Sequence, residues 1–69
     1  MKDELKQLKA LLGYWLEHNE EHAAEFREWA DKVPATQREV ADLLRQAVSK
    51  MTESNGYLRK AQTILDKEK

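Results

Sequence analysis

The chain has 69 residues, with 12 basic and 13 acidic side chains for a net charge of −1, and it contains no cysteine. A domain of this length buries a limited core unless a metal or a partner chain contributes. The absence of cysteine excludes disulfides, thiolate zinc sites and cysteine nucleophiles, so histidine and carboxylate are the strong metal ligands that remain. The balanced charge, without a basic stripe, argues against a nucleic-acid partner.

The longest mainly apolar run, residues 10–16, is much shorter than the roughly 20 residues that cross a bilayer, so we expect no membrane partner. Near the start of the chain we find no basic segment followed by an apolar stretch and a small-residue cleavage site. We therefore expect a soluble protein of the cytoplasm, a compartment whose reducing conditions suit a chain without cysteine.

The first half of the chain repeats apolar and aromatic residues at alternating spacings of three and four, the heptad pattern of a long helix. The stripe consists of Leu5, Leu8, Leu12, Trp15, Asn19, His22, Phe26, Trp29 and Val33. Gly13 lies outside it and weakens the helix by about 1 kcal/mol without ending it. Pro34 disfavours helical geometry at the preceding residue, so we predict a helix from about residue 3 to about residue 32.

A second helix is predicted after a turn at residues 33–36, because Thr36 and Glu39 have the spacing of a capping box. Its stripe is Val40, Leu44, Ala47, Met51, Ser54, Leu58, Ala61 and Leu65. Ser54, Asn55 and Gly56 together have the local chemistry of a helix end, which would break the helix and produce a three-helix bundle. Since the apolar phase agrees on both sides, we favour a continuous helix from about residue 37 to about residue 66.

These elements predict a single all-α domain over residues 1–69, an antiparallel hairpin of two long helices. Folding back at Pro34 sets large side chains of one helix against small ones of the other, with the rings of Trp15, Phe26 and Trp29 in the core. The predicted pairs include Trp15 with Ser54, Asn19 with Met51, and His22 with Ala47. The first 33 residues carry five basic and eight acidic side chains, a net −3, and the remainder carries +2, which favours their association.

The apolar surface is wider than one seam between two helices can bury. The residues flanking the two stripes are Leu11, Leu16, Ala23, Ala30, Ala41, Leu43, Val48, Tyr57 and Ile64. Two helices cannot cover both flanks, so we expect a two-fold homodimer that forms a four-helix bundle. The alternative three-helix fold would be a monomer.

Both histidines of the chain, His18 and His22, lie one helical turn apart and can chelate one metal ion through their ring nitrogens. Glu21 or Glu25 can complete the ligand set, and Asn19 can orient an imidazole by accepting its N–H. In a dimer the pair is duplicated at the subunit interface. Nickel, cobalt, zinc and copper all suit imidazole, so we predict a transition-metal protein for carriage or sensing.

A structural or interaction module without a ligand is the alternative, with His22 as a hydrogen-bonded core residue and Asn19 as a device that fixes helix register. The segment from His18 to His22 also matches H-x-x-E-H, a spacing found in one class of zinc peptidase. Such peptidases need a third ligand and a substrate cleft, which a chain of this length does not obviously provide. We therefore expect no enzymatic activity.

The segment from Trp15 to Ala30 resembles a group of small uncharacterised helical proteins of bacteria and archaea. In that group an HWxEHNxxH-like segment is followed by a tryptophan and by a second helix with an A-N-x-x-L-like midpoint, to which residues 54–58 are similar. Related segments accompany nickel-handling accessory proteins, so the resemblance implies metal handling, with His18, Asn19 and His22 as recurring polar positions. Here Tyr14 stands where a histidine often precedes the tryptophan.

Overall fold

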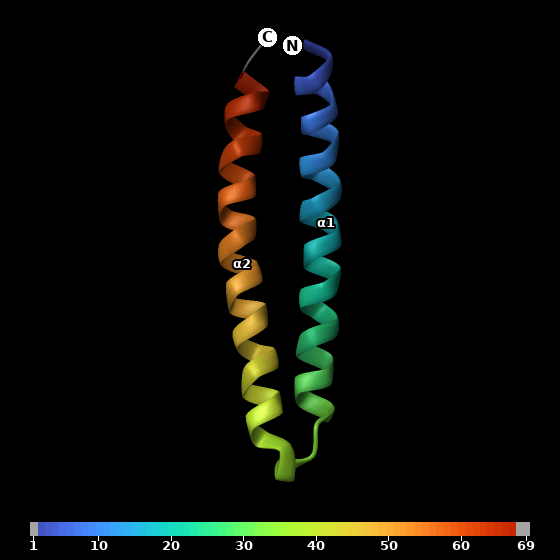
Figure 1. Ribbon diagram of the computed structural model, residues 1–69, viewed down its shortest axis with the longest axis vertical. Coiled ribbons are helices and arrows are strands. Elements are labelled where there is room, and N and C mark those ends of the chain that lie inside the picture. The colour runs from blue at the N-terminus through green and yellow to red at the C-terminus, as the bar shows by residue number, and fades with distance from the viewer. Residues whose placement is uncertain (1, 68–69) are drawn as a thin grey trace.

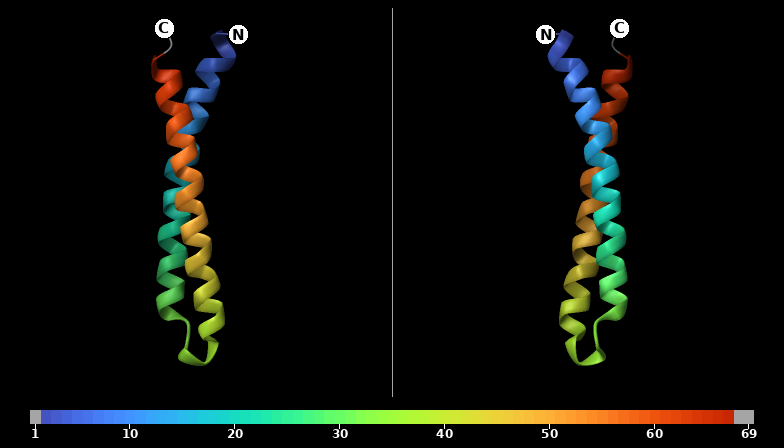
Figure 2. Two further views of the ribbon diagram at one scale, coloured as in Figure 1. Left: turned by 90° about the vertical axis from the view of Figure 1, so that its left-hand side faces the viewer. Right: turned by 90° about the vertical axis from the view of Figure 1, so that its right-hand side faces the viewer.

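The computed structural model describes residues 2–67, which form two long helices joined by a short turn. Helix α1 spans Lys2–Lys32, the 3-10 helix η1 spans Ala35–Gln37, and helix α2 spans Arg38–Lys67. The long helices lie side by side and antiparallel, with η1 at the closed end (Figure 1). Seen from the side, they cross at a shallow angle and separate toward the open end (Figure 2). The predicted all-α antiparallel hairpin is confirmed, and residues 2–67 contain no strand.

Pro34 ends the first helix, as predicted. The backbone N–H of Val33 still donates to the carbonyl of Trp29 at 3.0 Å, but Pro34 has no N–H to continue the pattern. Its ψ of 151° turns the chain, and its carbonyl accepts from the N–H of Gln37 at 2.8 Å. Thr36 already lies inside this 3-10 turn, so the predicted capping box is wrong: its threonine does not occupy the position before the helix.

Helix α2 continues through Asn55 and Gly56 without interruption, so the three-helix alternative is wrong for this chain. Between residues 2 and 67 neither glycine nor any other residue has a positive φ, and Gly56 therefore supplies no left-handed cap. The helix is held at this point by tertiary packing, because the side chain of Asn55 is only 4% exposed and faces α1. Packing overrides the local preference of the sequence for a helix end.

The seam between the two helices confirms Leu12 of the predicted stripe, but its other buried apolar side chains were predicted to flank the stripe. Its buried apolar side chains are Leu12, Leu16, Ala23, Ala30, Ala41 and Val48. The predicted core residues Trp15 and Trp29 each lie one residue before a buried position and remain 38% and 59% exposed. Alanine at the contact positions lets the helix backbones approach closely, and a tryptophan ring between them would hold them apart.

The predicted register is also wrong, by about one helical turn. Asn19 Nδ2 donates to Asn55 Oδ1 at 2.9 Å, whereas the prediction placed Asn19 opposite Met51, four residues earlier on α2. The predicted pairs of Trp15 with Ser54 and of His22 with Ala47 shift accordingly. The physical reason is polar satisfaction: a buried amide opposite Met51 would lack a hydrogen-bond partner, and opposite Asn55 it has one.

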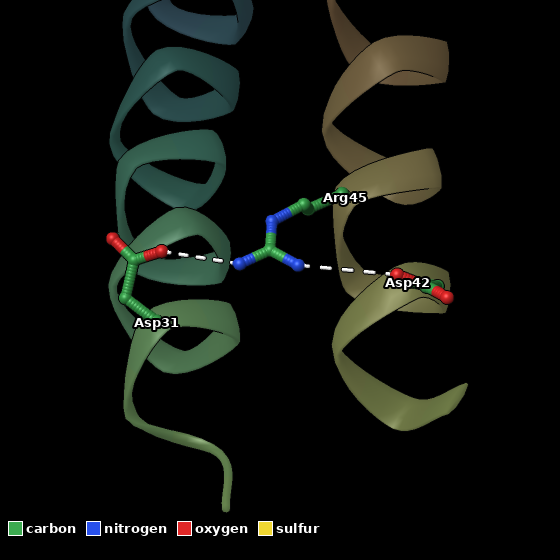
Figure 3. A network of polar contacts seen from close by, with 3 residues as sticks. All are labelled: Asp31, Asp42 and Arg45. Atoms are coloured by element: carbon green, nitrogen blue, oxygen red, sulfur yellow. Dashed lines mark hydrogen bonds and ion pairs between the residues drawn. The ribbon is translucent and has the colours of Figure 1, made fainter. Parts of the chain in front are cut away.

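One flank of the hairpin carries ion pairs between the helices. Arg45 Nη2 lies 3.2 Å from Asp31 Oδ1, and its Nη1 lies 3.9 Å from Asp42 of its own helix (Figure 3). Arg59 pairs with Glu20 on the same flank. These contacts join the acidic first helix to the basic second helix, in the sense that the charge distribution predicted. None of the described helices is long and apolar enough to span a bilayer.

Candidate functional site

His18 and His22 project from successive turns of α1, and their Nε2 atoms lie 2.9 Å apart. One imidazole donates its N–H and the other accepts it, so the two rings adopt different tautomers when both are neutral. His18 is exposed and His22 is half-buried. The prediction that His22 lies inside the seam is wrong, because Ala23 occupies that position and His22 lies beside it on the flank.

Four rings form an aromatic ladder along this face of α1, made of Tyr14, His18, His22 and Phe26. Tyr14 stacks on His18 with centroids 5.4 Å apart, and His22 stacks on Phe26 at 6.1 Å. Between them the two imidazoles meet edge to face, at 4.3 Å and an interplanar angle of 82°. Each ring is one turn from the next, the spacing at which side chains of a helix touch. The ladder holds both imidazoles in defined positions without any ligand.

The separation of the two Nε2 atoms can be compared with that of two ligands on one ion. Zinc binds imidazole nitrogen at about 2.0–2.1 Å, and at such bond lengths two nitrogens lie about 2.9 Å apart at a right angle and about 3.3 Å apart at a tetrahedral angle. The observed 2.9 Å equals the first value. The same separation is that of an N–H···N hydrogen bond, so to hold one ion the bridging proton must move to the other ring nitrogen of its histidine and both rings must turn a lone pair toward the ion.

The predicted carboxylate ligands are placed unequally around the histidine pair. Glu21 lines a shallow surface depression together with Tyr14, Glu17 and His18. Glu25 is exposed and lies outside this depression. Within the described residues, no three of the histidine and acidic side chains are gathered closely enough to hold a metal ion. The depression brings two carboxylates beside His18, namely Glu21, as predicted, and Glu17, which was not predicted.

Asn19 belongs to the seam between the helices. Its side-chain N–H donates to Asn55, and no buried side-chain polar atom of residues 3–67 lacks a hydrogen-bond partner. This arrangement fits the register role foreseen for Asn19, and its role in orienting an imidazole stays a prediction. Asn55 was not predicted as the partner of Asn19, although the A-N-x-x-L-like midpoint contains it.

The comparisons with known proteins place the chain in a family without assigning an activity. The model of a family described as a domain of unknown function, DUF8180, matches residues 8–65, and the chain belongs to this family. An uncharacterized protein of Archaeoglobus fulgidus is 39% identical over 57 residues, which cover 83% of this chain and 92% of that protein. No solved structure matches the chain. The family is thus one of small proteins with an archaeal member, as the resemblance implied.

Proposed function

We propose that this member of the DUF8180 family is a metal-binding protein in which His18 and His22 hold one divalent transition-metal ion. The observation that carries the proposal is the 2.9 Å separation of the two Nε2 atoms on an accessible face of α1. An ion between them would replace the shared proton and keep both rings in the aromatic ladder. The resemblance of the surrounding segment to proteins that accompany nickel handling supports the same chemistry, and carriage or sensing of the ion is the role we assign.

The spacing favours some metals over others. Nickel(II) and copper(II) adopt square-planar or tetragonal geometry with nitrogen ligands, which needs the shorter separation found here. Zinc in a tetrahedral site needs the longer one, and so requires the two side chains to move apart. We expect Glu21 or Glu25 to supply an oxygen ligand and Asn19 to act indirectly. We also place the protein in the cytoplasm, on its cysteine-free composition.

Titration of untagged, chelator-stripped protein with nickel, cobalt, zinc and copper tests this proposal. A metal that binds the folded chain stabilises it by about 2.7 kcal/mol at one hundred times its dissociation constant. For a domain of this size that corresponds to a rise in melting temperature of roughly 10 °C or more. Isothermal calorimetry should rank nickel and copper above zinc.

The matched variants for this titration are His18→Phe and His22→Phe, because phenylalanine preserves a ring in the aromatic ladder and removes the ligand atom. Each single variant should lose most of the metal response, and the double variant should lose all of it. A second pair, His18→Ala and His22→Ala, removes ring and ligand together. If wild type and the double variants respond alike to every metal, the proposal is wrong.

A structural or interaction module is the second candidate, favoured by the fact that the imidazoles and Asn19 all have partners without a ligand. On this hypothesis the Asn19–Asn55 pair fixes the register of the helices, the imidazoles bond only to each other, and no metal raises the melting temperature. The phenylalanine variants would then be as stable as wild type. Neither candidate assigns catalysis to the chain, and the absence of enzymatic activity stays a prediction.

A further inference from the structure

The isolated hairpin exposes more surface than a folded monomer of its mass. Its accessible surface is 5733 Å², whereas a monomeric protein of 8.1 kDa exposes about 4,500 Å². The radius of gyration of 15.9 Å compares with about 11 Å for a compact chain of 69 residues. The excess, about 1,200 Å², is larger than the roughly 800 Å² that each partner covers in a standard protein interface.

The core of the hairpin is correspondingly thin. Three of its six buried apolar side chains are alanines, and no side chain described in the structure is less than 2% exposed. Large apolar side chains lie outside it, namely Leu5, Leu8, Leu11, Tyr14, Trp15, Trp29, Val40, Leu43, Tyr57 and Ile64, each at least 36% exposed. A small chain with so little buried volume gains most from burying a second face.

The ion pairs show which flank remains available. Glu20 comes one position after the seam residue Asn19, and Arg59 comes one position after Leu58. Glu20 and Arg59 form an ion pair between the helices. Positions that follow the seam on both helices therefore project to one common side, the polar flank. Positions that precede the buried residues project to the opposite side, which we call the apolar flank. It consists of Leu11, Trp15, His22 and Trp29 on α1 and of Val40, Ala47, Ser54 and Tyr57 on α2, where Tyr57 precedes the seam residue Leu58.

We infer that the apolar flank is covered by a second copy of this chain, which produces a two-fold bundle of four helices. The excess surface of each chain is larger than the area that one partner covers in a standard interface, so it is sufficient for a stable dimer. Both helices contribute large exposed apolar side chains to the flank, among them Trp15, Trp29 and Tyr57, so a second copy offers a matching apolar surface. Charges beside it are of both signs, with Glu25 and Lys32 on α1, so it does not require a partner of opposite charge.

The second copy also completes the ligand set, an extension that rests on the proposed function. His18 and His22 lie near the middle of the 31-residue helix α1, and His22 is part of the apolar flank. A two-fold axis that crosses the helices at right angles at the level of residue 20 sets α1 of one copy antiparallel to α1 of the other. The two histidine pairs are centred on that level, so they face each other and offer four imidazoles to one ion. We therefore assign one metal ion to each dimer.

Sedimentation equilibrium of untagged, chelator-stripped protein tests the interface, and native mass spectrometry after nickel addition tests the stoichiometry. We expect twice the 8.1 kDa of one chain and one nickel ion per two chains. Replacing both flank rings, Trp15→Glu with Trp29→Glu, should raise the dimer dissociation constant at least 100-fold and leave the helical circular dichroism spectrum unchanged. Thr52→Glu, an exposed substitution on the polar flank, is the matched control and should remain dimeric.

The outcomes separate the interface from the metal. A dimer that takes up no metal supports the interface and overturns the proposed function. A monomer that binds one ion per chain supports the proposed function and overturns the interface. If the double tryptophan variant fails to fold, wild-type tryptophan emission provides the second measurement. Dilution through the dissociation range should shift it to longer wavelength as both rings become exposed. Protein that is monomeric at every concentration, with or without nickel, overturns the inference.

Discussion

Replacing Asn55 with alanine should lower the stability of the protein more than any other single polar substitution on α2. Asn55 is 4% exposed, and its side-chain oxygen accepts the hydrogen bond from Asn19 at 2.9 Å. The alanine variant removes this bond and leaves the Asn19 amide in the seam without its partner, at a cost of about 1–3 kcal/mol. For a domain of this size that lowers the melting temperature by roughly 5–20 °C.

A double-mutant cycle isolates the contribution of the amide pair. Asn19→Leu and Asn55→Leu should each destabilise, because each strands one amide against an apolar side chain. The double variant should recover most of the loss, since both polar groups are gone, with a coupling energy of about 0.5–3 kcal/mol. Thermal unfolding followed by circular dichroism, at one fixed protein concentration, measures all four members of the cycle.

Thr52→Ala is the control for this cycle, because Thr52 is an exposed neighbour of Asn55 on the same helix and should change stability by less than about 0.5 kcal/mol. Additive effects of the two leucine substitutions would refute the reasoning, since they would mean that the amides do not interact. An Asn55→Ala variant with the same melting temperature as the Thr52→Ala control would also refute it.

Three further predictions concern the helices. Gly13→Ala and Gly56→Ala should each stabilise the protein by up to about 1 kcal/mol in urea unfolding, because a Cβ at either position meets nothing within 4 Å; a loss of stability would show that the space is occupied. Ala23→Leu should cost about 1–3 kcal/mol in the same assay by overpacking the seam, whereas Ala24→Leu, at an exposed position, should be nearly neutral. Arg45→Ala should cost no more than about 1 kcal/mol, and less in high salt, because its ion pairs are exposed; a larger, salt-independent cost would contradict this.

The helices and the turn could be predicted from the sequence alone. Heptad spacing and Pro34 are local signals, and they placed the helices at about 3–32 and 37–66, within a residue of Lys2–Lys32 and Arg38–Lys67. The agreement of apolar phase across Asn55 and Gly56 was the better guide there than the turn-like composition. Helical periodicity likewise determined that His18 and His22 would be neighbours, because residues four apart lie on successive turns of one face.

The contacts between the helices were decided by tertiary structure. Trp15 and Leu16 are both apolar and both fit a repeat of three and four, so the sequence pattern alone does not choose between them. The choice depends on how closely two backbones can approach, and alanines at the contact positions favour the side of the stripe that buries Leu16. The register depends in turn on the pairing of Asn19 with Asn55, a hydrogen bond between residues far apart in the chain.

The same distinction between local sequence and tertiary structure applies to the candidate site. The sequence by itself determined that two imidazoles stand one turn apart beside several carboxylates, since spacing along one helix is a local property. Only the folded hairpin decided that the pair lies on the flank rather than in the seam, because that depends on which face of α1 the second helix covers. The same packing left the tryptophans exposed beside the histidines and turned the polar flank away from them.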